Sequence, residues 1–325
     1  MRTLCSLATA LLVAALCAAP VQAGQTQDWS FDGVDRIDVD GVSGDIIVRA
    51  GTGSSVQVTL NQTVAPEGAF QAEVDMSGST LRVRERWGRG RSSGSASWTL
   101  EVPAAADLEI SADTASGDLE ASGVSARFDF STASGDVVLR ELTLTTGSSF
   151  STASGDLELT DVTVADYVEM STASGNVELT RVNAATRFEA STASGDVVIE
   201  DSEGELEAST ASGNVRMRGN LTGPSEFSSA SGDVDVVVES TVAHDIEAST
   251  ASGDVTFEGA FGSDFTLVMT KRVDGGSIDS PFEATSQEEF ERSGRMYVRQ
   301  TVVRGAGGPE IRLDSASGSI RVRSR

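Results

Sequence analysis

The sequence predicts an all-β fold, a single-chain parallel β-solenoid with coils of about 20 residues and β-rich caps. Three observations indicate it. A motif of the form T-A-S-G-D recurs along the middle of the chain at intervals of 18 to 21 residues, and apolar residues alternate with polar ones on both sides of each copy. The chain is also rich in glycine, with 33 residues, and poor in proline, with 6.

Residues 1–23 have the features of a secretory signal peptide. Arg2 precedes an apolar run from Leu4 to Ala19, and Val21-Gln22-Ala23 resembles a cleavage site with small residues. We therefore expect an exported protein, located in the periplasm, on the cell surface or outside the cell. The chain's two cysteines, Cys5 and Cys17, both lie in this segment. The mature chain would then have no disulfide, and its stability must come from hydrogen-bonded ladders and side-chain packing.

Residues 24–106 are expected to form an N-terminal β cap. "RIDVDGVSGDIIVRAG", "SSVQVTLNQTV" and "STLRVRER" alternate as strands do, and "SWTLEVP" leads into the first full repeat. A cap is needed because the open end of a solenoid exposes unpaired strand edges.

Residues 107–258 are expected to form the regular coils. The motif glycines are Gly117, Gly135, Gly155, Gly175, Gly195, Gly213, Gly232 and Gly253. Two and four residues after each glycine stand mostly Val, Leu or Ile, and seven and five residues before it stand mostly Ile, Phe, Val, Leu, Met or Ala. This alternation predicts two half-buried strands per coil.

The motif itself is interpreted as a corner between the two strands. The inward positions are odd offsets before the glycine and even offsets after it, so the backbone must bend there, and glycine permits unusual φ angles. The residue after the glycine is Asp in most copies, but Asn176, Asn214 and Ser319 also occur. These three types share a short side-chain acceptor, which favours a structural role. The alternative is a ligand site repeated in every coil.

Residues 259–325 are expected to form the C-terminal β coils and cap. "FTLVMT", "MYVRQTVV", "EIRLDS" and "SIRVRS" alternate as strands, and "SASGS" gives a late copy of the motif around Gly318.

The repeats from "LEVPAAADLEISADTASGDLEA" through the serial "SGDV" segments to "IRLDSASGSIRV" resemble the bacterial family of unknown function labelled "putative adhesin". The resemblance covers nearly all of the mature chain. It implies a β-solenoid of the surface or envelope, and it supplies no catalytic residues.

The charge distribution and composition exclude several functions. From Asp107 to Phe265 the chain has 30 acidic and 6 basic residues, which argues against nucleic acid or anionic lipid as a partner of this region. The single histidine, His244, and the single lysine, Lys271, give no catalytic constellation. We therefore predict no catalytic residues and no cofactor.

One column of acidic residues offers a metal hypothesis. The glutamates six positions before the glycine would stack along one face: Glu169, Glu189, Glu207, Glu226 and Glu247. Calcium or magnesium could relieve their repulsion, because both cations take oxygen ligands. The alternative is a solvated face that keeps the rod soluble and discourages lateral stacking.

One basic cluster offers a partner-binding hypothesis. It comprises Arg82, Arg84, Arg86, Trp87, Arg89 and Arg91 in "LRVRERWGRGRSSGS". Arginines beside an aromatic ring can hold phosphate or sugar surfaces. The alternative is that alternating arginines protect a strand edge.

These features together predict a non-catalytic envelope or surface protein. We expect an adhesin-like scaffold that binds another envelope component, a protein or a glycan, through a regular solenoid face. Two alternatives are a carbohydrate-active enzyme of the β-helix type and a cation-responsive sensor that uses the glutamate column. An enzyme would gather dissimilar polar residues in a groove, whereas the aligned columns are uniform.

Overall fold

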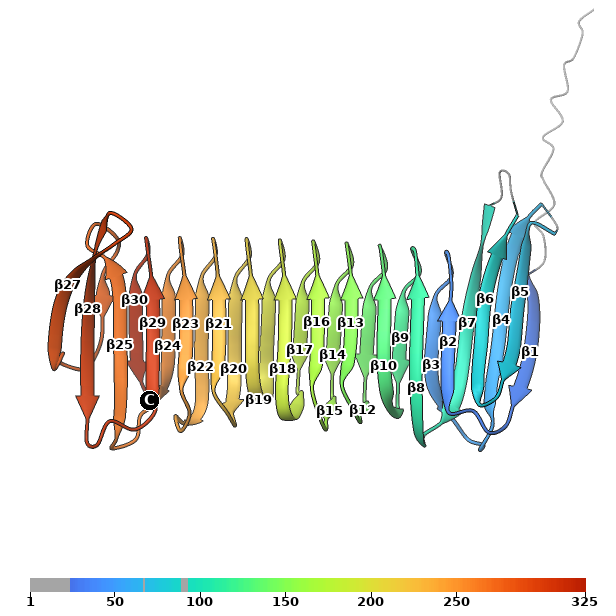
Figure 1. Cartoon of the computed structure of the whole chain (residues 1–325), viewed down its shortest axis with the longest axis horizontal. Helices are drawn as coiled ribbons and strands as arrows, with labels where there is room; N and C mark the ends of the chain where they lie inside the picture. Colours follow the sequence, from blue (N-terminus) through green and yellow to red (C-terminus); the bar gives the residue numbers. More distant parts are fainter. Residues whose placement is uncertain (1–23, 67, 89–92) are drawn as a thin grey trace, which may run out of the picture.

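A computed structural model of the chain describes residues 24–66, 68–88 and 93–325 and shows a long rod of stacked coils between two caps (Figure 1). Every regular element in these residues is a strand, so the all-β prediction is confirmed. The predicted signal peptide, residues 1–23, lies outside the described residues.

The middle of the rod consists of two facing sheets. The strands before each corner form the sheet nearer the viewer in Figure 1, here called the front sheet: β8 (Ala105–Thr114), β10 (Ser125–Thr132), β13 (Ser148–Thr152), β16 (Val168–Thr172), β18 (Asn183–Thr192), the last part of β19 (Val197–Thr210), β21 (Ser225–Ser229) and β23 (Ile246–Thr250). The strands after each corner form the back sheet: β9 (Leu119–Ser122), β11 (Val137–Arg140), β14 (Leu157–Thr160), β17 (Val177–Thr180), the first part of β19, β20 (Val215–Leu221), β22 (Val234–Thr241) and β24 (Val255–Ala260).

Neighbouring coils pair in parallel, with equivalent residues beside one another. Phe130 is the partner of Phe150 in the front sheet, and Val137 is the partner of Leu157 in the back sheet. The inward residues fill the space between the sheets. Phe130 packs edge to face against Phe128 and Phe150, with ring centroids 5.1 and 5.9 Å apart, and all three rings are buried. Burial of these columns is the main favourable term for the fold, because no disulfide joins the coils.

The glycine of each corner is required by close backbone approach. A Cβ on Gly175 would lie 2.5 Å from the carbonyl carbon of Gly155 and closer still to its oxygen. The same relation links ten glycines in turn: Gly44, Gly117, Gly135, Gly155, Gly175, Gly195, Gly213, Gly232, Gly253 and Gly318. None of the ten has a positive φ, so the expectation that the corner needs an unusual φ is wrong. The side chain is excluded because adjacent coils touch at this point.

The polar residues of the corner tie each coil to its neighbour. The Thr152 hydroxyl donates to the carbonyl oxygen of Gly135 in the preceding coil (3.0 Å) and accepts from the amide of Gly155 in its own corner (3.0 Å). The side-chain oxygen after the glycine accepts the equivalent amide of the next coil. Asp136 accepts from Asp156 at 2.8 Å, and Asn176 accepts from Asp196 at 2.9 Å. The interchange of Asp, Asn and Ser follows, because an uncharged acceptor makes the same bond.

A second corner follows the back strand and was not predicted. Four non-glycine residues adopt positive φ there, between 51° and 58°: Glu141, Asp161, Arg181 and Asp201. Gly123 occupies the same position in its coil, with φ of 68°. After this corner two coils add a short third strand, β12 (Thr143–Leu144) and β15 (Thr163–Val164), so two strands per coil is an incomplete description.

We expect Glu141→Gly to stabilise the protein. Glu141 is exposed and has φ of 55°, a conformation that costs a side-chain-bearing residue about 1–2 kcal/mol. Glycine removes this cost but raises the entropy of the unfolded chain, which leaves a net gain of about 0.5–1 kcal/mol. Urea unfolding measures the change, with Glu141→Ala as the control that keeps the strained φ. A glycine variant less stable than the wild type would contradict this account.

At the N-terminal end the chain leaves the stack and returns to it. The elements are β1 (Gln25–Phe31), β2 (Arg36–Asp40), β3 (Ile46–Gly51), β4 (Val56–Ala65), β5 (Phe70–Ser77), β6 (Thr80–Trp87) and β7 (Ser93–Pro103). β2 lies between β6 and β8, and β3 lies between β7 and β9, all in parallel. The corner of Gly44 is therefore the first coil of the stack, although it precedes residue 107. Strands β1, β4, β5, β6 and β7 extend the sheets outward with antiparallel pairs.

Glu85 is a buried hydrogen-bond acceptor at the N-terminal end of the stack. Its buried carboxylate accepts the amides of Val42 (2.8 Å) and Ser43 (3.3 Å) and the indole N–H groups of Trp87 (3.0 Å) and Trp98 (2.9 Å). These four donors would otherwise be unsatisfied at the first corner.

The C-terminal end repeats this arrangement. The elements are β25 (Phe265–Arg272), β26 (Ile278–Asp279), β27 (Ser286–Arg292), β28 (Arg295–Arg304), β29 (Glu310–Ser315) and β30 (Ile320–Ser324). The last segment, β29 and β30, inserts between β23 and β24 on one side and β25 and β26 on the other. β28 and β27 close the front sheet with antiparallel pairs. The stack thus extends beyond residues 107–258 at both ends, while the predicted boundaries at 106 and 258 stay predictions.

Candidate binding surface

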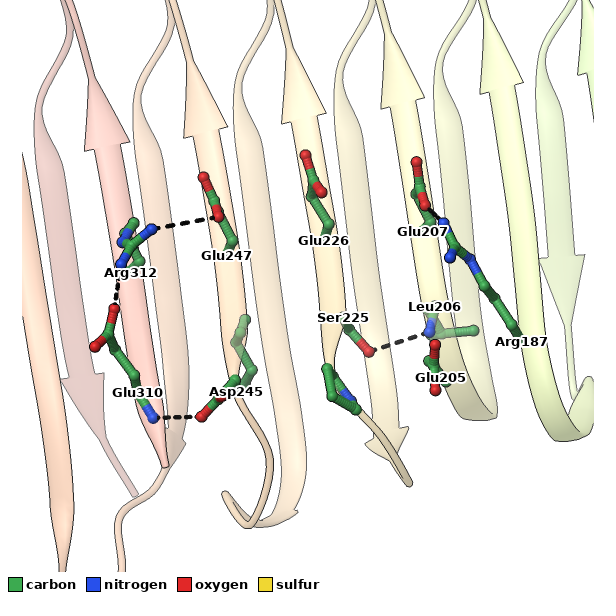
Figure 2. A pocket seen from close by; sticks show the side chains of 12 residues that line it. Arg187, Glu205, Leu206, Glu207, Ser225, Glu226, Asp245, Glu247, Glu310 and Arg312 are labelled. Carbon is green, nitrogen blue, oxygen red and sulfur yellow. Dashed lines mark hydrogen bonds and ion pairs between the residues drawn. The ribbon is translucent and has the colours of Figure 1, made fainter. Parts of the chain in front are cut away.

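The front sheet carries the predicted column of glutamates as a continuous row. Glu169, Glu189, Glu207, Glu226 and Glu247 are register partners in sequence across β16, β18, β19, β21 and β23. Their side chains point outward because the flanking residues of each strand are inward, as Val168 and Met170 are on either side of Glu169. Figure 2 shows three of them, Glu207, Glu226 and Glu247, side by side on neighbouring strands.

A groove of about 440 Å³ lies along the C-terminal part of this row. Its floor includes Pro224 and Ser225. β21 begins at Ser225, whose register partner Ile246 begins the neighbouring strand β23. The hydroxyl of Ser225 accepts the amide of Leu206 on the neighbouring strand (3.1 Å), as Figure 2 shows.

Two arginines stand at the ends of the groove. Arg187 pairs with Glu207, and Arg312 lies 2.5 Å from Glu310 and 3.8 Å from Glu247 (Figure 2). Glu226 lies between these pairs and is exposed. Six carboxylates line the groove against two guanidinium groups, namely Glu205, Glu207, Glu226, Asp245, Glu247 and Glu310 against Arg187 and Arg312. The groove therefore has a net negative charge and complements a positively charged segment.

Glu247 lies in an unfavourable environment for a charge. Burial raises its pKa, and the repulsion from Glu226 adds to this, while Arg312 partly opposes both effects. The repulsion that motivated the calcium hypothesis is thus reduced by arginines at Glu207 and Glu247. In the part of the chain that the structure describes, no three acidic, histidine or cysteine side chains are close enough together to hold a metal ion. The metal site on the five glutamates stays a prediction.

The predicted basic cluster lies in the N-terminal cap, and the structure describes part of it. Arg82, Arg84 and Arg86 project from one side of β6, while Arg89 and Arg91 lie outside the described residues. β6 pairs with β5 along its whole length and with β2 over residues 80–84, so the edge-protection interpretation is wrong for Arg82 and Arg84.

Trp87 does not join these arginines. Strand alternation places it on the side of Leu81 and Val83, where its ring packs edge to face on Phe70 with centroids 5.1 Å apart. Arg86 pairs with Glu73 at 2.5 Å, and the register places Asp75 opposite Arg82. The arginine side is therefore partly neutralised by the cap itself.

A family model described as Toastrack DUF4097 matches residues 34–272, which is well over half of the chain. The chain belongs to this Toastrack family. No curated protein matches it.

The Toastrack chain is similar to several solved structures. One is a "putative adhesin" from Parabacteroides distasonis ATCC 8503, with 11% identity and a TM-score of 0.44, over 92% of this chain and 97% of that one. Another is a "putative lipid binding protein" from the same strain, with 13% identity and a TM-score of 0.40, over 93% and 97%. A third is a "putative adhesin" from Bacteroides fragilis NCTC 9343, with 14% identity and a TM-score of 0.38, over 93% and 98%.

No helix suited by length and apolar character to crossing a membrane is found among the described residues of this Toastrack protein.

The arginines that shape the Toastrack groove were not predicted from the sequence. Arg312 stands six residues before Gly318, so it occupies the glutamate column in the last motif copy and is the register partner of Glu247. Extending the column to that copy would have found it. Arg187 stands eight residues before its corner glycine, Gly195. The residue type at this position differs from coil to coil, so Arg187 belongs to no column.

We expect Tyr167 of the Toastrack stack to titrate far above an ordinary tyrosine. Its hydroxyl donates to Glu189 (2.8 Å), and burial together with this carboxylate raises the pKa of Tyr167 to about 12. The folded state thus holds its proton between pH 10 and 12 while the unfolded chain loses it, so stability falls as pH rises through this window. Ultraviolet titration of a Tyr297→Phe variant, which leaves Tyr167 as the one tyrosine, measures the pKa. A value near 10 would contradict the contact.

Proposed function

We propose that this Toastrack protein is an exported, non-catalytic, adhesin-like scaffold of the bacterial cell envelope. It binds a positively charged segment of another envelope component along its front sheet. The observation that carries this proposal is the row of glutamates in register across five adjacent strands, with a groove at one end. The row presents one carboxylate on each of five adjacent strands. It therefore suits a partner that extends across these strands.

Electrostatic attraction gives this face its selectivity. Like-charged partners are repelled, and exposed carboxylates attract cationic ones with a strength that falls as salt screens the field. The same charges also keep neighbouring rods apart, so the surface is protected from lateral association.

A matched pair of triple variants tests the proposal. In the front variant Glu207, Glu226 and Glu247 become Gln, and in the back variant Glu120, Glu158 and Glu178 of the other sheet become Gln. Each variant removes three negative charges, so their net charges are equal. We expect cross-linking in the envelope of the producing bacterium to yield a partner with the wild type and the back variant, and to lose it with the front variant. Equal losses from both would show non-specific charge attraction and would overturn the proposal.

The basic side of β6 is proposed as a second contact with the envelope. Reversing Arg82, Arg84 and Arg86 to Glu should weaken partner capture without unfolding the chain, because all three side chains are at least partly exposed. Export is tested separately by N-terminal sequencing of the protein from the envelope fraction. We expect the mature chain to begin at Gly24.

A further inference from the structure

The two sheets have unequal lengths at the N-terminal end of the rod, the blue end of Figure 1. Beyond β2, which belongs to the first coil, the front sheet continues with β6 and β5. Beyond β3 of the same coil, the back sheet continues with β7, β4 and β1. The back sheet is therefore one strand longer, and no strand of the described residues continues the front sheet opposite β1. This offset between β5 and β1 is here called the step.

Both strands of the step are apolar on their inner sides. Val74 and Met76 of β5 and Trp29 and Phe31 of β1 pack against the core, yet each of the four is partly exposed. Among the described residues β1 pairs with β4 alone and β5 with β6 alone, so each strand also has a free row of backbone N–H and C=O groups. A free edge of this kind is a template for pairing with another strand.

The outermost front strand at the C-terminal end, β27, is protected against such pairing. Its register with β28 places Glu289 beside the buried Val298, so Glu289 and Glu291 stand on the inner side of this edge. A further strand would bury their charges, which opposes its addition. Phe282 fills the interior near this end, where its ring packs on Phe265 with centroids 5.1 Å apart. The contrast between the two ends argues against head-to-tail addition of copies and indicates that strands are added at the N-terminal end.

The step is complementary in shape to a second copy of itself. A two-fold axis parallel to the strands and midway between the sheets exchanges the front and back layers of two copies that meet end to end. β1 of each copy, which reaches one strand further than β5, then lies beside β5 of the other copy. Both steps are filled at once, because the two contacts are equivalent.

The directions of the strands agree with this arrangement. β5 runs opposite to β2, because β6 is parallel to β2 and β5 is antiparallel to β6. β1 runs in the direction of β3, to which it is connected through β4 and β7, and the corner at Gly44 turns β3 opposite to β2. β1 and β5 therefore run in the same direction. Rotation about the axis keeps this direction, so the two strands pair in parallel, as the coils do.

The side chains of the two strands are compatible in one parallel register. When Val74 stands beside the partner's Phe31, the apolar residues of both strands face the shared interior. Gln71 then stands beside the partner's Asp28, the single charged residue of β1. Asp28 thus avoids the two acidic residues of β5 and lies in line with Arg86, the register partner of Gln71. Opposite charges on one row favour this register over its neighbours.

We propose that two copies of this protein dock through their N-terminal ends, with β5 of each copy paired to β1 of the other. The contact completes the hydrogen bonds of both edges and covers the apolar residues of both steps. The product is one longer rod with both glutamate rows exposed. The contact uses no residue of the glutamate row, so it does not depend on the proposed function.

Sedimentation equilibrium of residues 24–325, without an N-terminal tag, tests the proposal. We expect the mass of two chains. Val74→Lys places a charge on the inner side of β5 and should give the mass of one chain, because pairing would bury the ammonium group. Glu289→Lys is the matched control, since it places the same side chain on the inner side of the other outermost strand, and it should remain a dimer. A wild type with the mass of one chain, or equal effects of the two variants, would overturn the proposal.

Disulfide cross-linking tests the arrangement without an inward charge. Gln71→Cys and Asp28→Cys are combined in residues 24–325, which contain no other cysteine. Within one chain the two positions lie in different sheets and cannot join. Neighbouring positions of paired strands are within reach of a disulfide, so we expect oxidation to link two chains. Gln71→Cys with Thr59→Cys is the control, because Thr59 is the register partner of Asp28 one strand further from the contact. Linkage in neither variant, or equally in both, would contradict the docked arrangement.

Discussion

Gly175→Ala is expected to destabilise the rod by more than about 4 kcal/mol. The added Cβ would lie 2.5 Å from the carbonyl carbon of Gly155, which is backbone. The hydroxyl of Thr172 holds this carbonyl in place, because it donates to the oxygen of Gly155 and accepts the amide of Gly175. Relief requires the two coils to separate, and separation breaks the bonds that the corner makes to its neighbour. Because each coil contacts only adjacent coils, the damage divides the stack into two shorter arrays. Urea unfolding followed by far-UV circular dichroism measures the loss.

The control for this prediction lies in the same corner. Ser174 is exposed and directly precedes the glycine, so Ser174→Ala adds no atom and should change stability by no more than about 0.5 kcal/mol. If both variants unfold at the wild-type urea concentration, the close approach of the corners is not present in solution.

Glu85→Gln is expected to destabilise the N-terminal cap by about 3–4 kcal/mol. The carboxylate accepts four N–H groups, from two amides and two indoles. The glutamine amide has one acceptor oxygen, and its NH₂ group would face donors that it cannot satisfy. The side chain is 8% exposed, so water does not replace the lost bonds.

Tryptophan fluorescence measures this effect selectively. All three tryptophans, Trp29, Trp87 and Trp98, belong to the N-terminal cap, so the fluorescence transition should move to lower urea concentration. Glu73→Gln is the control, because its pairing with Arg86 is solvent-exposed and contributes little to stability. A fluorescence transition that moves equally in both variants would contradict the role of Glu85.

Much of the fold could be predicted from the sequence because each coil repeats the same pattern of inward apolar and outward polar residues. The Val and Leu columns after the glycine and the apolar column before it gave the two strands. The physical reason for the glycine could not be predicted, because it depends on the carbonyl of another coil. The second corner left no sequence pattern either, since Glu141, Asp161, Arg181 and Gly123 share a backbone conformation and no side-chain chemistry.

The order of the coils at the two ends of the rod could not be predicted from the sequence either. The late motif copy around Gly318 was visible, but only the structure places β29 between β23 and β25 and β30 between β24 and β26. The glutamate row was predicted because all five members share one column. Arg187 was missed because it belongs to no column, and Arg312 was missed because the glutamate column was not extended to the last motif copy.

Distances between spin labels at the corners test the central claim that these corners stack coil upon coil. The cysteines of the sequence lie at positions 5 and 17, so a chain of residues 24–325 accepts pairs of labels without other changes. With one label at Ser134 and the second at Ser154, Ser194, Ser231 or Ser252, all exposed, the distance should grow by about 4.8 Å for each coil between them. A linear increase supports the stack, and distances that do not rise with the number of intervening coils would contradict it.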